Sequence, residues 1–274
     1  QSTRWIARAR RSDMIAASVE SARTSEPVST MTAGRLVAPT IDVTALRDYR
    51  QDRLRASMRK RDISVAVLSN PMSTRYAADL IENELYMSRT PTAILLFPVE
   101  GPVVGSGTYL PETDRIDRTV PSFNLSTFDA GLDLTDRSRH FADYMKNFLR
   151  ELGLADARPR IGLDRMDPST VQALMQVGIE CGDVNGAVEE AKSNKSDEEI
   201  TLIRHAVDVA QLAIATMREA VQPGVTENEL FSILNQVNIA HGGYWCDGRM
   251  LASGHRINPW LQEATDRIVE AGDL

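Results

Sequence analysis

Ile63-Ser64-Val65-Ala66-Val67-Leu68 is a short apolar run rich in β-branched residues, and Asn70-Pro71 comes two positions after it. This composition is typical of a strand buried within a sheet, and the Asn-Pro pair predicts its end. Upstream, over residues 42–61, apolar side chains recur at helical spacing among arginines and aspartates, which predicts a surface helix. A surface helix that leads directly into a buried strand indicates an α/β fold.

The sequence after this strand keeps alternating between strand and helix patterns. We predict a strand, turn and strand over residues 92–104, a helix over 137–152, a strand over 160–164, a helix after Asp167 and a short strand near Val184. Strands that alternate with helices predict a mixed sheet with helices on both faces. We assign this α/β domain to residues 42–190.

A different pattern begins after the charged stretch at residues 189–195, which we interpret as a linker. Ser196-Asp197-Glu198-Glu199 and Thr226-Glu227-Asn228-Glu229 are capping-box sequences, so each predicts the start of a helix. These helices are expected to form a hairpin in which each buries one stripe. The stripe of the first consists of Ile200, Ile203, Val207, Ala210, Ile214, Met217 and Val221.

The last part of the sequence predicts further strands. Residues 249–253 have a strand pattern, and residues 268–274 have the pattern of a turn that leads into another strand. We therefore expect residues 191–274 to form the first part of a second domain that continues beyond this sequence.

Residues 1–41 differ in composition from the rest of the chain. The first 40 positions hold six arginines, no lysine and three acidic residues, together with many Ser, Ala and Thr. Such a segment can resemble an organelle transit peptide, although it lacks the apolar core of a secretory signal. Because the chain begins with Gln1, we favour a disordered or non-native leader.

Charge and hydropathy disfavour several classes of protein. The formal net charge is -7, and no basic stripe with interleaved aromatic residues follows the leader, so we expect no nucleic-acid partner. The longest apolar run, residues 93–98, is far shorter than the roughly 20 residues that cross a bilayer. Cys181 and Cys246 belong to no CxxC or metal-binding pattern, which is typical of a reducing compartment. We therefore expect a soluble cytoplasmic protein that does not bind a membrane.

One loop combines several residues that can carry chemistry. None of the four histidines has the spacing of a zinc site on a helix, and GxGxxG, Walker and GxSxG sequences are absent. The segment 253–263 follows a predicted strand, and binding sites are commonly built on loops held by a rigid scaffold. It contains Gly254, His255, Asn258, Pro259 and Trp260. The alternative is a polar loop whose tryptophan packs into the core from the side.

The order of these motifs resembles the creatinase, prolidase and aminopeptidase P family of two-domain proteins. The resemblance runs from about residue 45 to residue 274. It is carried by Asn70-Pro71-Met72-Ser73-Thr74-Arg75-Tyr76, Lys192-Ser193, Ser196-Asp197-Glu198-Glu199-Ile200, Gln222-Pro223-Gly224-Val225-Thr226-Glu227, Leu251-Ala252-Ser253-Gly254 and Ala271-Gly272-Asp273-Leu274. It implies a creatinase-type N-terminal domain followed by the first part of an α+β pita-bread catalytic domain.

The same resemblance implies metal ions that this chain does not bind alone. Members of the family hold two divalent metal ions, and the first ligand comes just after a turn like Gly272-Asp273-Leu274. The ligands are therefore expected beyond Leu274, so that the full-length parent binds two ions of unknown identity and the 274-residue chain binds none.

Position 260 separates two branches of the family. Peptidases and creatinase carry a substrate-facing histidine six residues after the glycine that matches Gly254, and Trp260 stands there in this chain. The segments 251–254 and 258–263 instead resemble dimethylsulfoniopropionate lyases of the DddP type, although His255 stands where proline is expected. This implies cleavage of dimethylsulfoniopropionate to dimethyl sulfide and acrylate, with Trp260, Asn258 and His255 as substrate-binding candidates. The indole face would attract the sulfonium cation by roughly 0.5 to 2 kcal/mol.

The resemblance further implies a homodimer in which one N-terminal domain completes a site of its partner, and Tyr86 is the candidate for this contact. The alternative for Tyr86 is a half-buried aromatic residue of a strand or loop. Two other functions also remain open. The parent could be an Xaa-Pro aminopeptidase or dipeptidase acting on Xaa-Pro peptides, or a non-catalytic protein whose α/β domain serves in dimerisation or binding.

Overall fold

The computed structural model describes residues 30–32, 35–81, 93–108, 110, 113–155, 159–244, 246 and 248–274. The chain divides into two compact units. The first, Asp42–Glu198, is called the α/β unit below. The second, which contains Glu199–Leu274 and the described residues before Asp42, is called the C-terminal unit.

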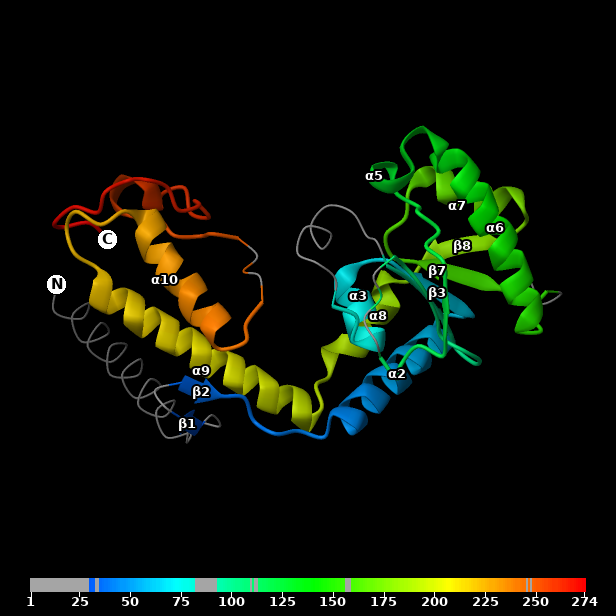
Figure 1. Cartoon of the computed structure of the whole chain (residues 1–274), viewed down its shortest axis with the longest axis horizontal. Coiled ribbons are helices and arrows are strands. Elements are labelled where there is room, and N and C mark those ends of the chain that lie inside the picture. Colours follow the sequence, from blue (N-terminus) through cyan, green and yellow to red (C-terminus); the bar gives the residue numbers. More distant parts are fainter. Residues whose placement is uncertain are drawn as a thin grey trace, which may run out of the picture. The chain divides into compact units, whose positions relative to one another are not determined.

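A six-stranded mixed sheet forms the centre of the α/β unit, with the strand order β6-β5-β4-β3-β7-β8. The strands are β3 (Val65–Leu68), β4 (Ile94–Pro98), β5 (Val104–Ser106), β6 (Arg118–Val120), β7 (Arg160–Leu163) and β8 (Glu180–Asp183). β4 pairs antiparallel with both of its neighbours, and the other pairs are parallel. Five strands therefore end at the same edge of the sheet, and the mixed sheet predicted from the sequence is confirmed (Figure 1).

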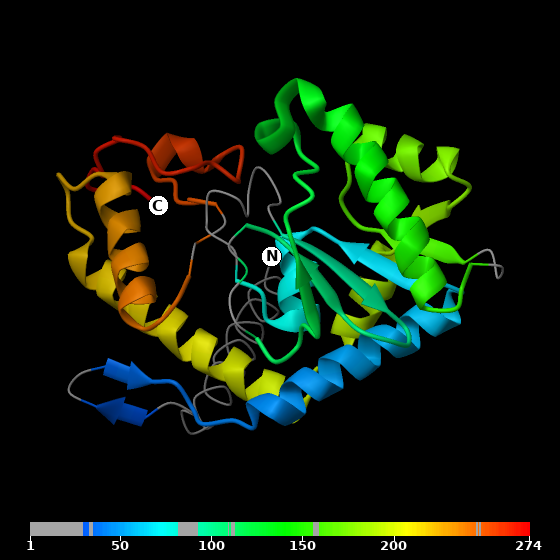
Figure 2. The same cartoon turned by 45° about the vertical axis from the view of Figure 1, so that its right-hand side comes forward.

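Helices cover both faces of this sheet, as the alternating pattern predicted (Figure 2). Ala66 and Leu68 of β3 pack in one cluster with α2 (Val43–Lys60), α3 (Pro71–Ala78) and α8 (Asn185–Ser193). Val65 and Val67 alternate with them and pack in the other cluster, with α6 (Leu134–Glu151) and α7 (Pro168–Gln176). The fully buried pattern of β3 follows from this double cover, because side chains along a strand point alternately to its two faces.

The charged stretch that we interpreted as a linker belongs mostly to α8. Ala187, Val188 and Ala191 are buried against α2, and the hydroxyl of Tyr76 donates a hydrogen bond to the carbonyl of Ala191 at 3.0 Å. The charged residues of this stretch occupy the outer side of the helix, which concealed its apolar side. The compact unit consequently extends to Glu198 and not to residue 190.

Three short elements of the α/β unit were not predicted. Asn70 ends β3 but also caps α3, with its side chain accepting a hydrogen bond from the amide of Met72 and Pro71 in the first turn. The strand β6 and the one-turn helix α5 (Thr127–Ala130), which continues into the 3-10 turn η1 (Gly131–Asp133), have no strong periodicity. Local capping and pairing, more than patterning, produce these elements.

The C-terminal unit contains α9 (Asp197–Ala220), α10 (Glu227–Ala240) and the 3-10 helix η2 (Gly254–Ile257). The predicted capping box of α10 is confirmed, because Thr226 and Glu229 satisfy each other's backbone amides. A short antiparallel pair, β1 (Thr30–Thr32) and β2 (Arg35–Val37), lies within the segment expected to be a disordered leader. Residues 1–29, the rest of the expected basic segment, lie outside the described residues.

The prediction that α9 buries its apolar stripe is wrong within the described structure. Ile200, Ile203, Val207 and Ile214 are 39–62% exposed, whereas Val209 and Ala213 on another side of the helix are buried. Among the described helices, α9 alone has the length and apolar composition that would also allow a membrane span. An exposed stripe of this kind equally suits a helix covered by further protein.

The strands predicted for residues 249–253 and 268–274 are also absent from the described part of this unit. Met250 forms one isolated bridge with Glu263, and Ile268 forms another with Thr226. These contacts order the segment as a series of turns that pack on the start of α10.

Candidate substrate-binding loop

A buried glutamate organises the loop that contains the candidate residues. Glu227 is the first residue of α10, and its side chain is fully buried. Ser253 donates to Oε1 through its amide at 2.8 Å and its hydroxyl at 2.9 Å. Thr265 donates to Oε2 through its amide at 3.1 Å and its hydroxyl at 2.9 Å, and the Arg256 guanidinium forms an ion pair with the same oxygen. Glu227 thus joins two ends of the loop 253–265 to one helix terminus.

The surroundings of Glu227 keep its carboxylate ionised. Burial is the largest single influence and raises its pKa, but the hydrogen bonds from Ser253 and Thr265 together outweigh burial, so the pKa is lowered. The start of a helix also favours a negative charge because its backbone amides point outward. A buried charge that is paired and fully hydrogen-bonded avoids most of the desolvation penalty.

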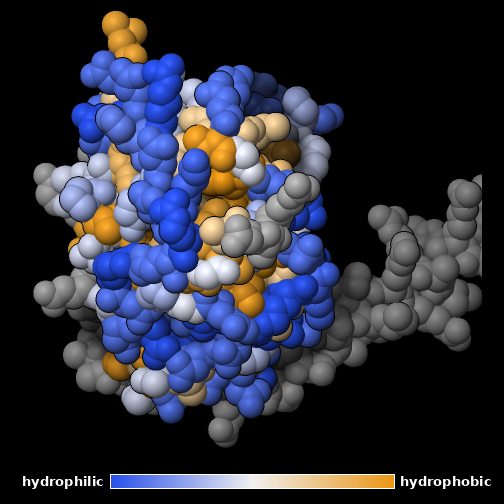
Figure 3. Space-filling view, turned by 90° about the vertical axis from the view of Figure 1, so that its right-hand side faces the viewer, coloured by the Kyte–Doolittle hydropathy of each residue, from blue (hydrophilic) through white to orange (hydrophobic). Residues whose placement is uncertain are grey.

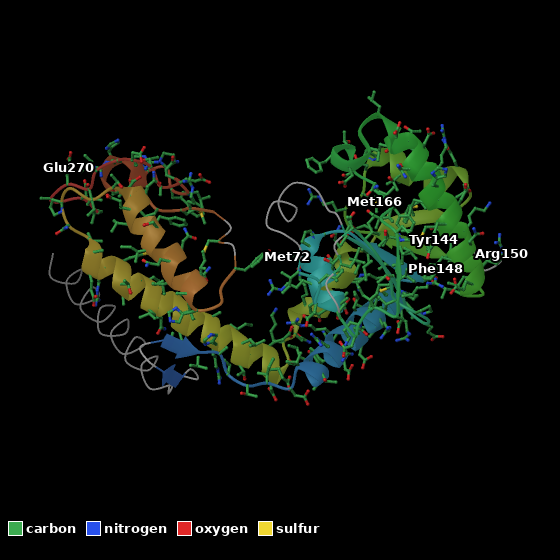
Figure 4. The ribbon with its side chains drawn as sticks, in the orientation of Figure 1. Met72, Tyr144, Phe148, Arg150, Met166 and Glu270 are labelled. Atoms are coloured by element: carbon green, nitrogen blue, oxygen red, sulfur yellow. The ribbon has the colours of Figure 1, made fainter. Side chains whose placement is uncertain are left out.

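A second ion pair fixes the neighbouring turn. Arg267 contacts Asp273 at 2.6 Å and also donates to the hydroxyl of Ser253 at 2.6 Å. The hydrogen bond from Arg267 is the main reason that the pKa of Asp273 is lowered, followed by the one from the amide of Glu270, which Figure 4 labels. Ser253 therefore contacts both charged groups, Glu227 and Arg267, so the two ion pairs form one network.

Gly254 is required at its position for two reasons. Its φ of +55° lies in the left-handed region, and a Cβ atom there would lie 2.4 Å from Oδ1 of Asp273 and 2.5 Å from Nη2 of Arg267. Any other residue would push apart the second ion pair of the network. The Ser-Gly string noticed in the sequence is thus explained by backbone conformation and close packing.

The loop held by this network exposes the three candidates that fall within the described residues. The Asn258-Pro259 peptide bond is cis, and Trp260 follows it with 77% of its surface exposed. Asn258 and His255 are exposed as well. The alternative in which the tryptophan packs into the core is therefore wrong for this unit. Tyr86, the fourth candidate, lies outside the described residues.

The chemistry available at this loop is recognition and not bond cleavage. An exposed indole offers a π face to a cation, while Asn258 and His255 offer neutral hydrogen-bonding groups. Within the described ranges, no three His, Cys, Asp or Glu side chains are grouped so that they could hold a metal ion. The loop can therefore bind part of a substrate, but it contains no group of ligands for the two expected ions.

Sequence reasoning missed the network that positions the loop. Glu227 was recognised only as a member of a capping box, since an acidic residue in the first turn of a helix is common. Its partners Ser253 and Thr265 lie 26 and 38 positions away, and no local pattern connects them. The Ser253-Gly254 and Gly272-Asp273 strings marked two of the sites where the network forms, but not the contact between them.

Comparison with known proteins agrees with this architecture. No family model matches the chain. The chain is 28% identical over 243 residues to "Dimethylsulfoniopropionate lyase DddP" of Roseovarius nubinhibens, which covers 85% of this chain and 54% of that protein. It is 29% identical over 203 residues to a creatinase of a Bacillus species, which covers 72% of this chain and 45% of that protein. The chain thus spans about half the length of the curated relatives it matches.

Solved structures show the same fold. An Xaa-Pro dipeptidase from Bacillus anthracis superposes with a TM-score of 0.59 at 20% identity, covering 83% of this chain and 59% of that one. The shared mixed sheet and helices, the ordered motifs of the sequence and the similarity to both a DddP lyase and a creatinase agree with one another. The chain belongs to the creatinase, prolidase and aminopeptidase P family.

Proposed function

We propose that this chain is part of a metal-dependent lyase that cleaves dimethylsulfoniopropionate into dimethyl sulfide and acrylate. Trp260 carries the proposal, because it is 77% exposed at the position where the resemblance to peptidases implies a histidine. The 28% identity to a DddP lyase over 85% of the chain supports it.

In this proposal the chain contributes recognition of the sulfonium group. The substrate has a permanent cation at one end and a carboxylate at the other. The indole of Trp260 would attract the cation by roughly 0.5 to 2 kcal/mol. A protonated histidine would repel it, and a neutral histidine offers a smaller π face. Asn258 and His255 would border the same substrate end.

The full-length parent is proposed to hold two divalent metal ions, as its family resemblance implies. When bound, such ions neutralise a substrate carboxylate and the charge that develops next to it. The residues described here include no suitable group of ligands, so no step of the reaction is assigned to a metal through this chain. The residue that removes the proton is likewise not assigned to this chain.

The peptidase function is the second candidate, because the solved structure of an Xaa-Pro dipeptidase shares the fold. Likeness at 20% identity supports the fold alone, and Trp260 is the feature that disfavours an Xaa-Pro substrate. The non-catalytic alternative, in which the α/β unit acts as a dimerisation or binding module, predicts that neither substrate is turned over.

We further propose that the parent is a cytoplasmic homodimer. Cys181 and Cys246 are free thiols, and burial raises the pKa of Cys181, which keeps it protonated and unreactive. Tyr86 remains the proposed contact with the partner. Sedimentation of residues 42–198 at high concentration tests self-association, and a strictly monomeric profile would count against the dimer.

The activity is tested with the full-length protein that contains this chain. Release of dimethyl sulfide should be measured by headspace gas chromatography, acrylate by liquid chromatography, and Xaa-Pro hydrolysis by release of proline. The proposal predicts equal amounts of dimethyl sulfide and acrylate and no proline. Efficient proline release without dimethyl sulfide would replace the lyase with the peptidase.

A further inference from the structure

The α/β unit has a pocket at the edge of the sheet where β3, β6 and β7 end. Its volume is about 340 Å³, and it is lined by Ser69, residues 125–128, residues 165–168 and the first residue of β4, Ile94. Pockets of this volume hold small molecules. The pocket lies wholly within the α/β unit, so its occupant is independent of the loop that carries Trp260.

The topology of the sheet explains why a pocket forms at this edge. After β3 the chain enters α3 on one face of the sheet, and after β7 it enters α7 on the other face. Asp164 ties the two diverging loops together by accepting hydrogen bonds from the amides of Ser69 at 2.8 Å and Asn70 at 3.1 Å. In open α/β sheets, ligands bind outside the carboxyl ends of the strands where neighbouring connections diverge in this way.

A second pocket of the unit lies at the opposite edge. Arg59, Ser64 and Leu152 contribute to its lining, next to the beginning of β3. The amino ends of strands are not where such sheets bind their ligands, and Arg59 already pairs with Glu100 there at 3.8 Å. The pocket at the carboxyl edge is therefore the stronger candidate, and the other provides a control.

Opposite charges and an apolar wall meet in the pocket at the carboxyl edge. Arg165 and Asp167 both line it, on either side of Met166, which Figure 4 labels. Asp167 stands at the N-cap of α7, yet its carboxylate does not cap that helix. Leu125 and Phe128 add apolar surface, and Phe128 is 66% exposed. Figure 3, which views this unit from the side of α6, shows apolar atoms exposed among hydrophilic side chains.

We propose that this pocket binds a small zwitterion of the amino-acid type with an apolar side chain. Its carboxylate would pair with Arg165, its ammonium group with Asp167, and its side chain would lie against Leu125 and Phe128. An anion without an ammonium group would be repelled by Asp167, and a cation without a carboxylate would be repelled by Arg165. A fully apolar ligand would leave both charges without a partner.

The test uses the whole 274-residue chain and amide chemical shifts in nuclear magnetic resonance titrations. The probes are phenylalanine and leucine, with 3-phenylpropionate as the carboxylate-only and phenethylamine as the amine-only comparison. We expect saturable shifts at Ser126 and Met166 with either amino acid, and affinities at least tenfold weaker for the two comparison probes, equivalent to about 1.4 kcal/mol.

Matched variants assign the two charges. Arg165→Gln and Asp167→Asn should each weaken phenylalanine binding about tenfold or more, whereas Arg59→Gln, in the opposite pocket, should leave it unchanged. Unshifted amides in β3 and β7 would establish that each variant is folded. Absence of saturable shifts, equal binding of 3-phenylpropionate, or unchanged binding by both pocket variants would overturn the proposal. None of these outcomes bears on cleavage of dimethylsulfoniopropionate.

Discussion

Replacement of Glu227 by glutamine would test whether this residue holds the candidate loop in place. The amide is nearly the same size as the carboxylate but keeps only one acceptor oxygen. If that oxygen serves the two donors of Ser253, the amide and hydroxyl of Thr265 face an NH2 group, and Arg256 loses its charge partner. Each unsatisfied buried donor costs about 1 to 3 kcal/mol, and breaking a buried ion pair costs about 3 to 5 kcal/mol.

Because Arg256 keeps 20% of its side chain exposed, water recovers part of that loss, and we expect a total near 3 kcal/mol for the C-terminal unit. Amide hydrogen exchange at Ser253 and Thr265 measures this directly, since 3 kcal/mol corresponds to roughly a hundredfold loss of protection. Glu263→Gln is the matched control. Glu263 is 61% exposed and pairs with Arg249 at 3.3 Å, and exposed pairs contribute at most about 1 kcal/mol.

The reasoning would be refuted by a Glu227→Gln chain whose protection at Ser253 and Thr265 stays within a few-fold of the unmodified chain. The same conclusion would follow if Glu263→Gln had an equal effect, because the loop would then depend on general acidity and not on one buried carboxylate. Amides of β3, in the other unit, serve as an internal reference in both variants.

Three further outcomes are expected. Gly254→Ala should expose the Ser253 amide to exchange, because the new methyl group meets Asp273 and Arg267 in a left-handed backbone; unchanged exchange would contradict the packing. The pKa values of Glu227 and Asp273 are lowered in the folded chain, so the stability they contribute is complete above their unfolded pKa values of about 4 and is lost as the pH falls through the lower folded values. Loop protection should therefore be constant from pH 7 to pH 5 and decline below about pH 4, and a decline already at pH 6 would exclude these carboxylates as the cause. Elemental analysis of the purified 274-residue chain should find far less than one tightly held divalent ion per chain, and two such ions would contradict the absence of a ligand group among the described residues.

Periodicity predicted the parts of the fold in which one face is buried or both are. The helix over residues 42–61 and the strand over residues 63–68 matched α2 and β3 because their apolar residues have the spacing of those elements. α8 was missed because the buried Ala187, Val188 and Ala191 are small and lie between charged residues. The stripe of α9 was detected, but spacing cannot indicate whether the chain itself covers a stripe.

The candidate site was predictable only in part, for the same physical reason. A loop with Gly254 and Trp260 has a recognisable composition, and the structure exposes the tryptophan as a binding loop requires. Its framework depends on contacts between Glu227 and residues 26 and 38 positions away. Such long-range hydrogen bonds have no local pattern in the sequence, and they emerge only when the turns of residues 249–274 are placed on the start of α10.

The role of Trp260 in the full-length lyase is the most direct test of the proposed function. Rates of dimethyl sulfide release should be measured for the unmodified enzyme and for Trp260→Phe, Trp260→Ala and Trp260→His, with the amide shifts of Ser253 and Thr265 as a check that the loop is intact. A cation–π contact of roughly 0.5 to 2 kcal/mol corresponds to a loss of about 2- to 30-fold in kcat/KM. We predict that phenylalanine retains part of the activity and that alanine and histidine lose most of it, whereas an unchanged rate in Trp260→His would contradict the assignment of Trp260 to the sulfonium group.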